Sequence, residues 1–501
     1  MSDAAAEIDP PAGSSPSGDD ASDVPVRSFS LRSAFALSFT DISPIVGIYS
    51  VFGIGLVVAG PAFWWAFPFV LFFQLLVTGV FGDLVSRWPL QGGVYAWARE
   101  LAGRRYGWWT NWWYDWALTI SIAAVALYAA IYLAPAVGLT SLSKTQTSLL
   151  ALGIVAFITT ANMLGSRFLR ALLYIALTAE LLSSLGIGIT MLFFYRVQPF
   201  SILFNTGGTA HGARWIFVPF LTVIAFVGFS FLGQDGAGAI GEEVRESRRV
   251  LPKAMVLALF AVGCLVMFAT LGLLLSLPDI GKVLTGQDTN PIATTLETHL
   301  GTATGRVLLA MLTIGYTSSG IALETAVSRA IWAGARDDEL PMSGFFRKLS
   351  GRDRLPRRVM AVVTVVAGAC LFIPGNVGTL LITAPVFGYF VAYAMPVLAL
   401  AATRAMRRWK PGVVSMGRVA GIVTWTAAVW IVAETVNVAW PRNTYNGVWY
   451  LNWGIVIMAC VLGVTGWAAQ AWVFRGRAQP GVPTAELTGA EPVPGDIQKE
   501  A

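Results

Sequence analysis

Charged residues are scarce in this sequence. Only 12% of its 501 residues are Asp, Glu, Lys or Arg, whereas 55% are hydrophobic. A soluble protein of this size needs far more charge on its surface, so the composition excludes a soluble globular protein. The net charge of +6 does not indicate a nucleic-acid partner, because the basic residues form short clusters between long apolar runs. Such a distribution is typical of an integral membrane protein.

Cysteine and histidine are also rare. The three cysteines, Cys264, Cys370 and Cys460, each lie inside an apolar run, and the two histidines are His211 and His299. Their spacing fits neither a disulfide framework nor a zinc site, and buried packing is the expected role of each cysteine. Two isolated histidines and scattered carboxylates also do not make the converging set that an enzyme needs. We therefore expect no metal, no cofactor and no catalytic residues.

The two ends of the chain differ from its apolar centre. Residues 1–27 are rich in Ala, Ser, Asp, Pro and Gly, and residues 478–501 contain several prolines. Both segments predict disordered tails, and the first lacks the basic start and apolar core of a signal peptide. Residues 28–477 form the predicted membrane domain. Its twelve apolar segments of spanning length lie at residues 33–59, 63–85, 107–133, 146–164, 171–195, 214–240, 253–277, 305–334, 359–377, 379–402, 417–439 and 449–474.

The basic residues predict how these segments are oriented. With the N-terminus inside, the outer loops hold only six of the chain's 34 lysines and arginines: Lys144, Arg196, Arg214, Lys282, Arg306 and Arg442. Lysine and arginine are enriched in cytoplasmic loops. The one-sided distribution therefore places both termini in the cytoplasm.

Two of the twelve segments contain residues that interrupt a helix. In the segment 33–59, the run from Asp41 to Gly47 places Ser43-Pro44 and a glycine near the middle of the span. In the segment 214–240, the run that begins at Phe229 admits glycines and a carboxylate, Asp235. In hydrocarbon a break persists only where the freed backbone groups line a cavity or meet other protein. Two broken spans, five spans apart, indicate a transporter with its binding site between them.

The breaks predict where a ligand binds. Free amides at the start of a half-helix favour a carboxylate, and free carbonyls at the end of a half-helix favour an ammonium group. Together the two breaks suit a zwitterion, with Phe229 as a gate over it; a simple kink at Ser43-Pro44 and a core role for Phe229 are the alternatives. The predicted substrate-binding residues are Ser43, Ile45, Val46, Gly47, Phe229, Ser230, Phe231 and Gly233.

Several polar residues inside the spans suit ion coupling. A carboxylate in hydrocarbon is costly unless it is paired or hydrated, so Glu180, Asp235 and Glu324 are candidates for proton coupling. Ser318 and Ser319 offer hydroxyl oxygens of the kind that bind sodium. Helix packing or an inner vestibule is the alternative role for each of these residues. We favour proton over sodium coupling because the titratable groups are more numerous.

Three stretches carry recognisable signatures. Pro89-Leu90-Gln91-Gly92-Gly93-Val94-Tyr95-Ala96-Trp97 has the pattern P-x-x-G-G-x-Y-x-W. Gly233-Gln234-Asp235 is followed by Glu242-Glu243-Val244 and by Arg248-Arg249-Val250-Leu251-Pro252-Lys253-Ala254. Ser328-Arg329 precedes Ala333, Arg336-Asp337, Leu340-Pro341 and Ser343. In this order and spacing they resemble motifs of the amino acid–polyamine–organocation transporter superfamily, and the chain looks closest to its bacterial and fungal amino acid and choline permease branch.

The resemblance implies a LeuT-like, all-α fold of twelve transmembrane helices with helices 1 and 6 broken. Residues 33–195 and 214–402 would form two inverted repeats of five helices, and residues 417–474 two peripheral helices. The implied activity is secondary active transport of an amino acid or related amine across the plasma membrane by alternating access, as a proton symporter or an exchanger. Transport of choline, a polyamine or a nucleobase, with sodium as the coupling ion, is the alternative. A membrane-embedded enzyme, a channel or a receptor has no supporting motif.

The chain also departs from the superfamily's pattern. Gln234 stands where an aromatic residue is expected, Asp41-Ile42-Ser43-Pro44 replaces a start rich in Gly, Ser and Thr, and span 5 lacks the lysine that some proton-coupled members use. The cytoplasmic motifs predict charge pairs that hold an inner gate. Its predicted residues are Gly92, Gly93, Tyr95, Glu242, Glu243, Arg329, Arg336 and Asp337.

Overall fold

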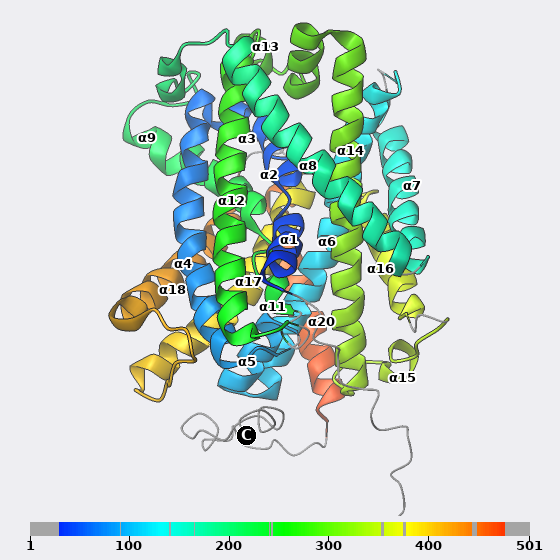
Figure 1. Ribbon diagram of the computed structural model, residues 1–501, viewed down its shortest axis with the longest axis vertical. Coiled ribbons are helices and arrows are strands. Elements are labelled where there is room, and N and C mark those ends of the chain that lie inside the picture. The colour runs from blue at the N-terminus through cyan, green and yellow to red at the C-terminus, as the bar shows by residue number, and fades with distance from the viewer. Residues whose placement is uncertain are drawn as a thin grey trace, which may run out of the picture.

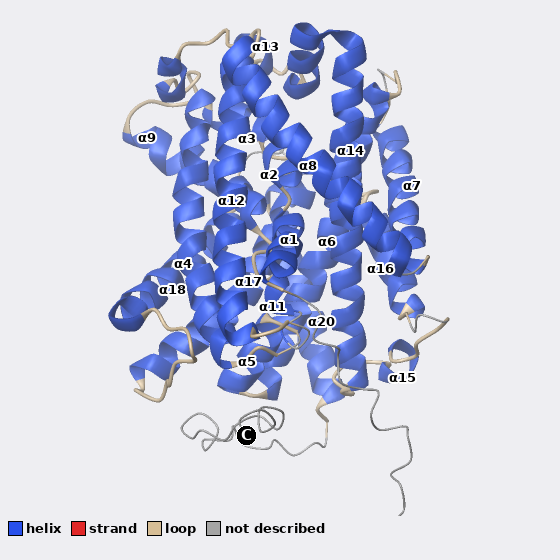
Figure 2. Ribbon diagram, in the orientation of Figure 1, coloured by secondary structure: helices blue, strands red, loops and turns tan. Residues whose placement is uncertain are grey.

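The computed structural model describes residues 30–475, except residues 91, 140–141, 165, 240, 242–243, 352–354, 374–376 and 443–447. Its described residues form helices and loops and no strand, and an isolated bridge joins Ser350 and Leu355. The loops gather at the two ends of the molecule (Figure 2). A helix satisfies its own backbone hydrogen bonds, which is why long apolar runs adopt this form in a membrane. Both predicted tails lie outside the described residues.

The first half of the chain begins with a bent segment and continues through long helices (Figure 1). Its elements are α1 (Leu31–Ile42), α2 (Pro44–Tyr49), α3 (Phe52–Ala59), η2 (Pro61–Trp65), α4 (Ala66–Arg87), α5 (Val94–Ala102), α6 (Arg104–Ala136), α7 (Lys144–Met163) and α8 (Ser166–Phe194).

The second half begins with another interrupted segment. Its elements are η3 (Phe200–Phe204), α9 (Ala213–Trp215), η4 (Ile216–Phe220), α10 (Leu221–Val227), η5 (Gly228–Phe231), α11 (Gly236–Ala239), α12 (Ser247–Ser276), α13 (Ile280–Leu284), α14 (Pro291–Arg336), α15 (Ser343–Phe346), α16 (Arg357–Cys370), α17 (Val377–Ala405), η7 (Gly417–Val419), α18 (Ala420–Ala439), α19 (Trp449–Asn452) and α20 (Gly454–Val473).

Each of the twelve predicted spans overlaps helical structure, but not every one has the length of a full span. Nine helices of the described chain are long and apolar enough to cross a membrane, and a tenth span results if the bent pair Ala34–Tyr49 and Phe52–Ala59 counts as one. Within α8, the apolar segment Thr178–Phe194 is shorter than a full membrane span. Helix α16 has only 14 residues. The finding is therefore an all-α membrane protein with nine or ten candidate spans.

The helices pack into a bundle whose two ends differ (Figure 1). Helices α5 and α15 lie at one end, and α13 lies at the opposite end; we call these the α5 end and the α13 end. Helix α6 packs against α14 and α17, whereas α12 packs against α4, α8 and α1. The short helices α1 and α2 lie between these groups, in the middle of the molecule. Two of the segments predicted to be cytoplasmic, those that contain α5 and α15, thus lie at the same end.

Candidate functional site

The first predicted break is present at Ser43. Helix α1 ends at Ile42, Ser43 has φ 51° and ψ 105°, and α2 begins at Pro44. Proline has no amide hydrogen and disfavours helical geometry in the residue before it, so Ser43-Pro44 ends one helix and starts the next. The Ser43 hydroxyl also accepts a bond of 3.4 Å from the amide of Val46, which caps α2.

The second predicted break follows η5. The 3-10 turn η5 ends at Phe231, Leu232 is extended, and Gly233 has φ 86°. Glycine adopts this positive φ at little cost because it has no Cβ. The chain becomes helical again at Gly236, the first residue of α11. Residues 232–235 therefore leave backbone groups outside regular helix at the depth where the sequence predicts a ligand.

The two broken segments meet where Gly47 of α2 faces Ser230 of η5. The Ser230 hydroxyl donates a bond of 2.7 Å to the carbonyl of Gly47. A Cβ at Gly47 would lie 3.1 Å from the Ser230 carbonyl oxygen, so the two backbones approach closely because residue 47 is glycine. This contact is the centre of the candidate site.

All eight predicted substrate-binding residues are buried, but they do not share one surface. Ser43, Ser230 and Phe231 are 0% exposed, and Val46 and Phe229 are 5% exposed. Ile45 faces α14, where a Cβ at Gly315 would lie 2.2 Å from its Cδ1 atom. The Phe231 ring lies edge-on to Phe67 of α4, at 6.4 Å. The structure therefore brings Gly47 and Ser230 together, and turns Ile45 and Phe231 toward neighbouring helices.

Two carboxylates and a tyrosine lie on the α11 side of this contact. A Cβ at Gly236 would lie 2.3 Å from Oδ2 of Asp41, which places the Asp41 carboxylate against the second break. The Tyr393 hydroxyl donates to Asp235 and accepts a bond of 3.3 Å from the amide of Gly233. The rings of Tyr389 and Tyr393 are 5.5 Å apart on α17. Sequence reasoning missed these tyrosines, and their i, i+4 spacing in one span was the available signal.

The side-chain amide of Gln234 faces another buried side-chain amide, that of Gln74. The Gln234 Nε2 atom lies 3.4 Å from Oε1 of Gln74 on α4, and both side chains are 0% exposed. Neither Gln234 Oε1 nor Gln74 Nε2 has a hydrogen-bond partner among the described residues. The departure from an aromatic residue at position 234 is thus matched by a polar residue across from it.

Glu180 connects the first break to α8. The Ser43 hydroxyl donates a bond of 2.8 Å to Glu180 Oε1. Glu180 is 0% exposed, and its Oε2 atom has no partner in the described part of the chain. The Ser184 hydroxyl, one turn further along α8, is likewise buried and unpartnered there. Glu180 thus lies at the first break, as the coupling candidate Asp235 lies at the second.

The other coupling candidates have different surroundings. Glu324 of α14 accepts bonds of 2.7 Å from Thr159 and from Asn162, both on α7, and one of 3.3 Å from Thr364 on α16. This carboxylate joins three helices through neutral donors. The Ser318 hydroxyl donates to the carbonyl of Gly315 in its own helix, and Ser319 is 3% exposed.

Aromatic residues close the α13 side of the breaks. The Tyr132 hydroxyl donates a bond of 2.8 Å to the carbonyl of Tyr49, and the hydroxyls of Ser50 and Tyr316 lie 2.7 Å apart. The rings of Tyr132 and Tyr316 stack at 5.8 Å. These contacts bind the end of α2 to α6 and α14, so the structure is closed on this side of the candidate site.

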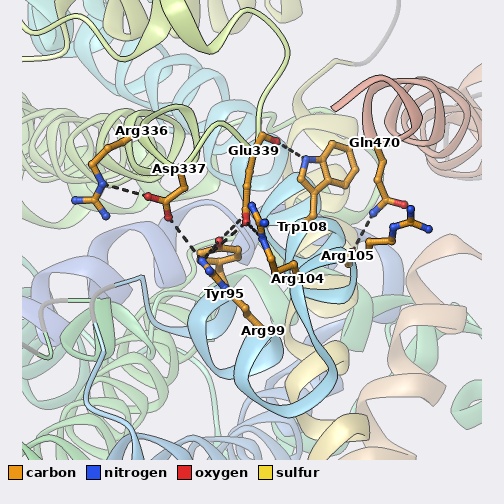
Figure 3. Close-up of polar contacts among 9 residues, drawn as sticks. All are labelled: Tyr95, Arg99, Arg104, Arg105, Trp108, Arg336, Asp337, Glu339 and Gln470. Carbon is orange, nitrogen blue, oxygen red and sulfur yellow. Dashed lines mark hydrogen bonds and ion pairs between the residues drawn. The ribbon is translucent and has the colours of Figure 1, made fainter. Parts of the chain in front are cut away.

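Two of the three motifs predicted to be cytoplasmic meet at a residue that sequence reasoning missed, Glu339 (Figure 3). Its side chain is only 2% exposed, accepts a bond of 2.7 Å from the Tyr95 hydroxyl and lies 2.9 Å from Nε of Arg104. The Trp108 indole donates a bond of 2.6 Å to its carbonyl. Arg99 lies 3.9 Å from the Glu339 carboxylate. We call these residues the Glu339 cluster; it joins α5, the start of α6 and the loop after α14.

The surroundings of Tyr95 keep its hydroxyl protonated. Burial raises its pKa, and the neighbouring Glu339 carboxylate raises that pKa further. Tyr95 therefore remains a hydrogen-bond donor to Glu339 at physiological pH. Gly92 and Gly93, with φ 99° and 50°, form the turn that starts α5 and positions this side chain.

The predicted gate residues have different positions around this cluster. Asp337 lies 3.6 Å from Arg99 and 3.2 Å from Arg336, so it belongs to the same charged group. Arg329 is exposed and forms no ion pair with another described residue. Glu242 and Glu243 lie outside the described residues, so their predicted pairs with the arginines stay predictions.

Comparisons with known proteins agree with the three signatures. Residues 29–462 match the model of the family described as "Amino acid permease". Amino-acid permease BAT1 of Arabidopsis thaliana is 24% identical, over 83% of this chain and 86% of its own length. Low-affinity putrescine importer PlaP of Escherichia coli (strain K12) is 26% identical, over 66% of this chain and 70% of its own. GABA-specific permease of Saccharomyces cerevisiae is 23% identical, over 84% of this chain and 76% of its own.

Proposed function

Because this chain belongs to the amino acid permease family, we propose that it carries an amino acid or a related amine across the plasma membrane by alternating access. It is a multi-pass secondary transporter and not an enzyme. The names of the relatives given above concern amino acids, GABA and putrescine. These compounds share an amino group, which is the feature that we assign to the substrate.

The observation that carries this proposal is the contact between the two broken segments. Ser230 bonds to the carbonyl of Gly47, and both breaks lie within a few residues of that bond. A charged substrate needs replacements for its lost hydration. Broken helices supply free backbone donors and acceptors for this purpose. We therefore place the substrate against the predicted residues around Gly47 and Ser230, entering where these segments separate.

Asp41 and Asp235 support an amine as part of the substrate. Both lie beside the second break, and the Asp235 side chain accepts a hydrogen bond from the neutral hydroxyl of Tyr393. Carboxylates in a membrane interior are costly unless a counter-charge or a proton neutralises them. An ammonium group near Gly233 would provide that counter-charge, and the rings of Tyr389 and Tyr393 provide faces that attract cations.

For the fold, we propose the LeuT-like arrangement of twelve spans. Segments α1–α8 would form one repeat of five spans, and segments α9–α17 its inverted copy, with α18 and α20 as peripheral spans. The support is positional: each repeat would begin with a broken span, the first at Ser43 and the second at residues 232–235. Both termini would be cytoplasmic, at the α5 end.

For the coupling ion, we propose a proton carried by Glu180. Its carboxylate bonds to Ser43, the residue at the first break, and its second oxygen is buried without a described partner. A buried carboxylate of this kind is stable when protonated and costly when ionised. Gain or loss of the proton would therefore change the geometry of the break that holds the substrate.

Counterflow in proteoliposomes tests the proposed function. Vesicles loaded with an unlabelled amino acid, GABA or putrescine are diluted into the labelled compound. A carrier shows saturable uptake that is stimulated by substrate inside. Absence of such stimulation for amino acids, choline, polyamines and nucleobases would contradict the proposal. If uptake stops when sodium is replaced by an inert cation at constant pH, the coupling ion is sodium and not the proton.

A further inference from the structure

A cavity lies at the α5 end, between the start of α6 and the end of α20. Its volume is about 370 Å³, and its lining residues are Arg105, Trp467, Gln470, Ala471, Phe474 and Arg475. Two of the six carry positive charge, and none is acidic. The cavity is thus basic, and it stands apart from the candidate substrate site in the middle of the molecule.

Contacts between the two helices hold the basic side of the cavity in place. The Gln470 side chain donates a bond of 2.9 Å to the carbonyl of Arg105, as Figure 3 shows. The guanidinium of Arg105 lies 5.8 Å from the centre of the Phe474 ring. Arg475 follows Phe474 at the end of α20 and is exposed. One arginine is therefore positioned by an aromatic face and the other stands at the rim.

An exposed apolar stripe leads from the cavity along α20. Trp467 and Val464 are each 68% exposed, Val461 is 54% exposed and Ile457 is 41% exposed. Residues three or four apart lie on one face of a helix, so these side chains form a continuous stripe. Only 17% of the apolar, membrane-spanning part of α20 is buried in the protein. The stripe ends near Arg105 and Arg475, which line the cavity.

We propose that this cavity binds the phosphate headgroup of an anionic phospholipid, whose acyl chains lie along the stripe. Basic pockets between membrane helices on the cytoplasmic side suit such headgroups. Arginine forms paired hydrogen bonds with phosphate oxygens. A free phosphate would use the arginines but not the stripe, which is why we assign a lipid. This inference goes beyond the proposed transport function and does not depend on the substrate.

The lipid site adjoins the Glu339 cluster. Arg104 lies 2.9 Å from Glu339, and its guanidinium is also 5.7 Å from the Phe474 ring that lines the cavity. Arg104 and Arg105 are adjacent in the chain and lie near the same ring, one at the cluster and one at the cavity (Figure 3). A bound lipid would therefore contact the segment that positions the cluster.

Native mass spectrometry of the purified full-length protein tests the proposal, with phosphatidylglycerol and phosphatidylcholine as probes. We expect the unchanged protein to retain phosphatidylglycerol in preference. The double variant Arg105→Gln/Arg475→Gln should bind it roughly 30-fold more weakly, because each basic residue near a membrane surface contributes about 1 kcal/mol. Arg105→Lys/Arg475→Lys keeps the charges and should retain most of the preference, which separates loss of charge from loss of folding.

The matched control removes two other exposed arginines, as Arg408→Gln/Arg418→Gln. It should leave phosphatidylglycerol binding unchanged. Equal losses in control and test variants, or no preference in the unchanged protein, would overturn the proposal. Displacement of the lipid by equimolar inorganic phosphate would show an anion site without lipid specificity. Improved lipid binding after removal of residues 476–501 would make the chain's own C-terminal segment the occupant. Both of these results would also overturn the proposal.

Discussion

Glu180 is the residue at which the proposed coupling is most directly tested. In Glu180→Gln the amide can still accept the hydrogen bond from Ser43, but it has no proton to release. We expect counterflow to continue, because it needs no net proton movement, and uptake driven by an imposed pH gradient to be lost. Parallel assays of the two activities in the same vesicles measure this separation.

Glu434 on α18 provides the control for Glu180. It is also a buried carboxylate, and it accepts bonds of 3.1 and 3.0 Å from Asn437, away from both breaks. Glu434→Gln should leave gradient-driven uptake intact. If Glu180→Gln still responds to the pH gradient, the coupling proton is not on Glu180.

Glu339 is expected to stabilise the α5 end. Removing one partner of a buried charge pair typically costs about 3–5 kcal/mol. We expect Glu339→Ala to lower the free energy of unfolding by only about 3 kcal/mol, the lower limit of that range. The reason is that Arg104 and Arg99 are 33% and 35% exposed, so water can solvate them. Thermal unfolding followed by tryptophan fluorescence measures the loss.

Asp338→Asn is the control for that measurement, because asparagine removes the charge and still tolerates the positive φ of 55° at this position. Asp338 is the preceding residue, and its pair with Arg347 is exposed on both sides, at 55% and 57%. Exposed pairs contribute little, so the melting temperature should hardly change. Equal melting temperatures for the Glu339 and Asp338 variants would show that the Glu339 cluster does not hold this end together.

Residues that act through local chemistry were predictable from the sequence, and residues that act through distant partners were not. Ser43-Pro44 interrupts a helix through the local geometry of proline. The sequence therefore predicts this break without knowledge of the surrounding helices. Glu339 follows a recognised Arg-Asp pair, yet its role depends on Tyr95, which is 244 positions away. Tyr393 likewise meets Asp235 across 158 positions. The spacing of Tyr389 and Tyr393 could mark a shared helix face, but local spacing could not show which distant residue either Tyr393 or Glu339 contacts.

At the scale of elements, the contact between α2 and η5 limits what residue 47 can be. A Cβ at Gly47 would lie within 3.2 Å of backbone atoms of Ser230. Gly47→Ala should therefore push α2 away from η5, at a cost of about 1–3 kcal/mol for overpacking. We expect the counterflow rate to fall sharply while the protein still purifies as a folded monodisperse species.

Gly53→Ala is the matched change on α3. Its nearest atom outside the local backbone is Cγ of Pro291 at 3.8 Å, an ordinary van der Waals contact. Transport by this variant should resemble that of the unchanged protein. A Gly47 variant with normal counterflow would show that close approach of the two broken segments is not required.

Helix boundaries agree with the sequence-based prediction where the length of an apolar run sets them. They differ from the prediction where a capping residue sets them. The predicted span 305–334 lies within α14, which begins earlier, at Pro291, because Asn290 caps it by accepting from the amide of Ala293. Gly301, with φ 79°, separates this added part from the rest. Helix α16 has 14 residues, whereas the predicted segment 359–377 extends into positions outside the described residues.

At the scale of the whole molecule, the distribution of basic residues predicts which end faces the cytoplasm. In a chain without its three native cysteines, we expect Lys282→Cys at the α13 end to react with an impermeant maleimide added to intact cells. Arg408→Cys should react only after the cells are permeabilised. Both positions are exposed, so access and not burial decides the result. The opposite labelling pattern would invert the proposed topology.

We place the substrate where the two broken segments meet, and a substrate-bound structure is the decisive test of this placement. The compound that gives the strongest counterflow would be added before cryo-electron microscopy. We expect ligand density against the backbone of residues 43–47 and 228–233, with any ammonium group toward Asp41 and Asp235. Density elsewhere, with both segments forming continuous helices, would contradict it.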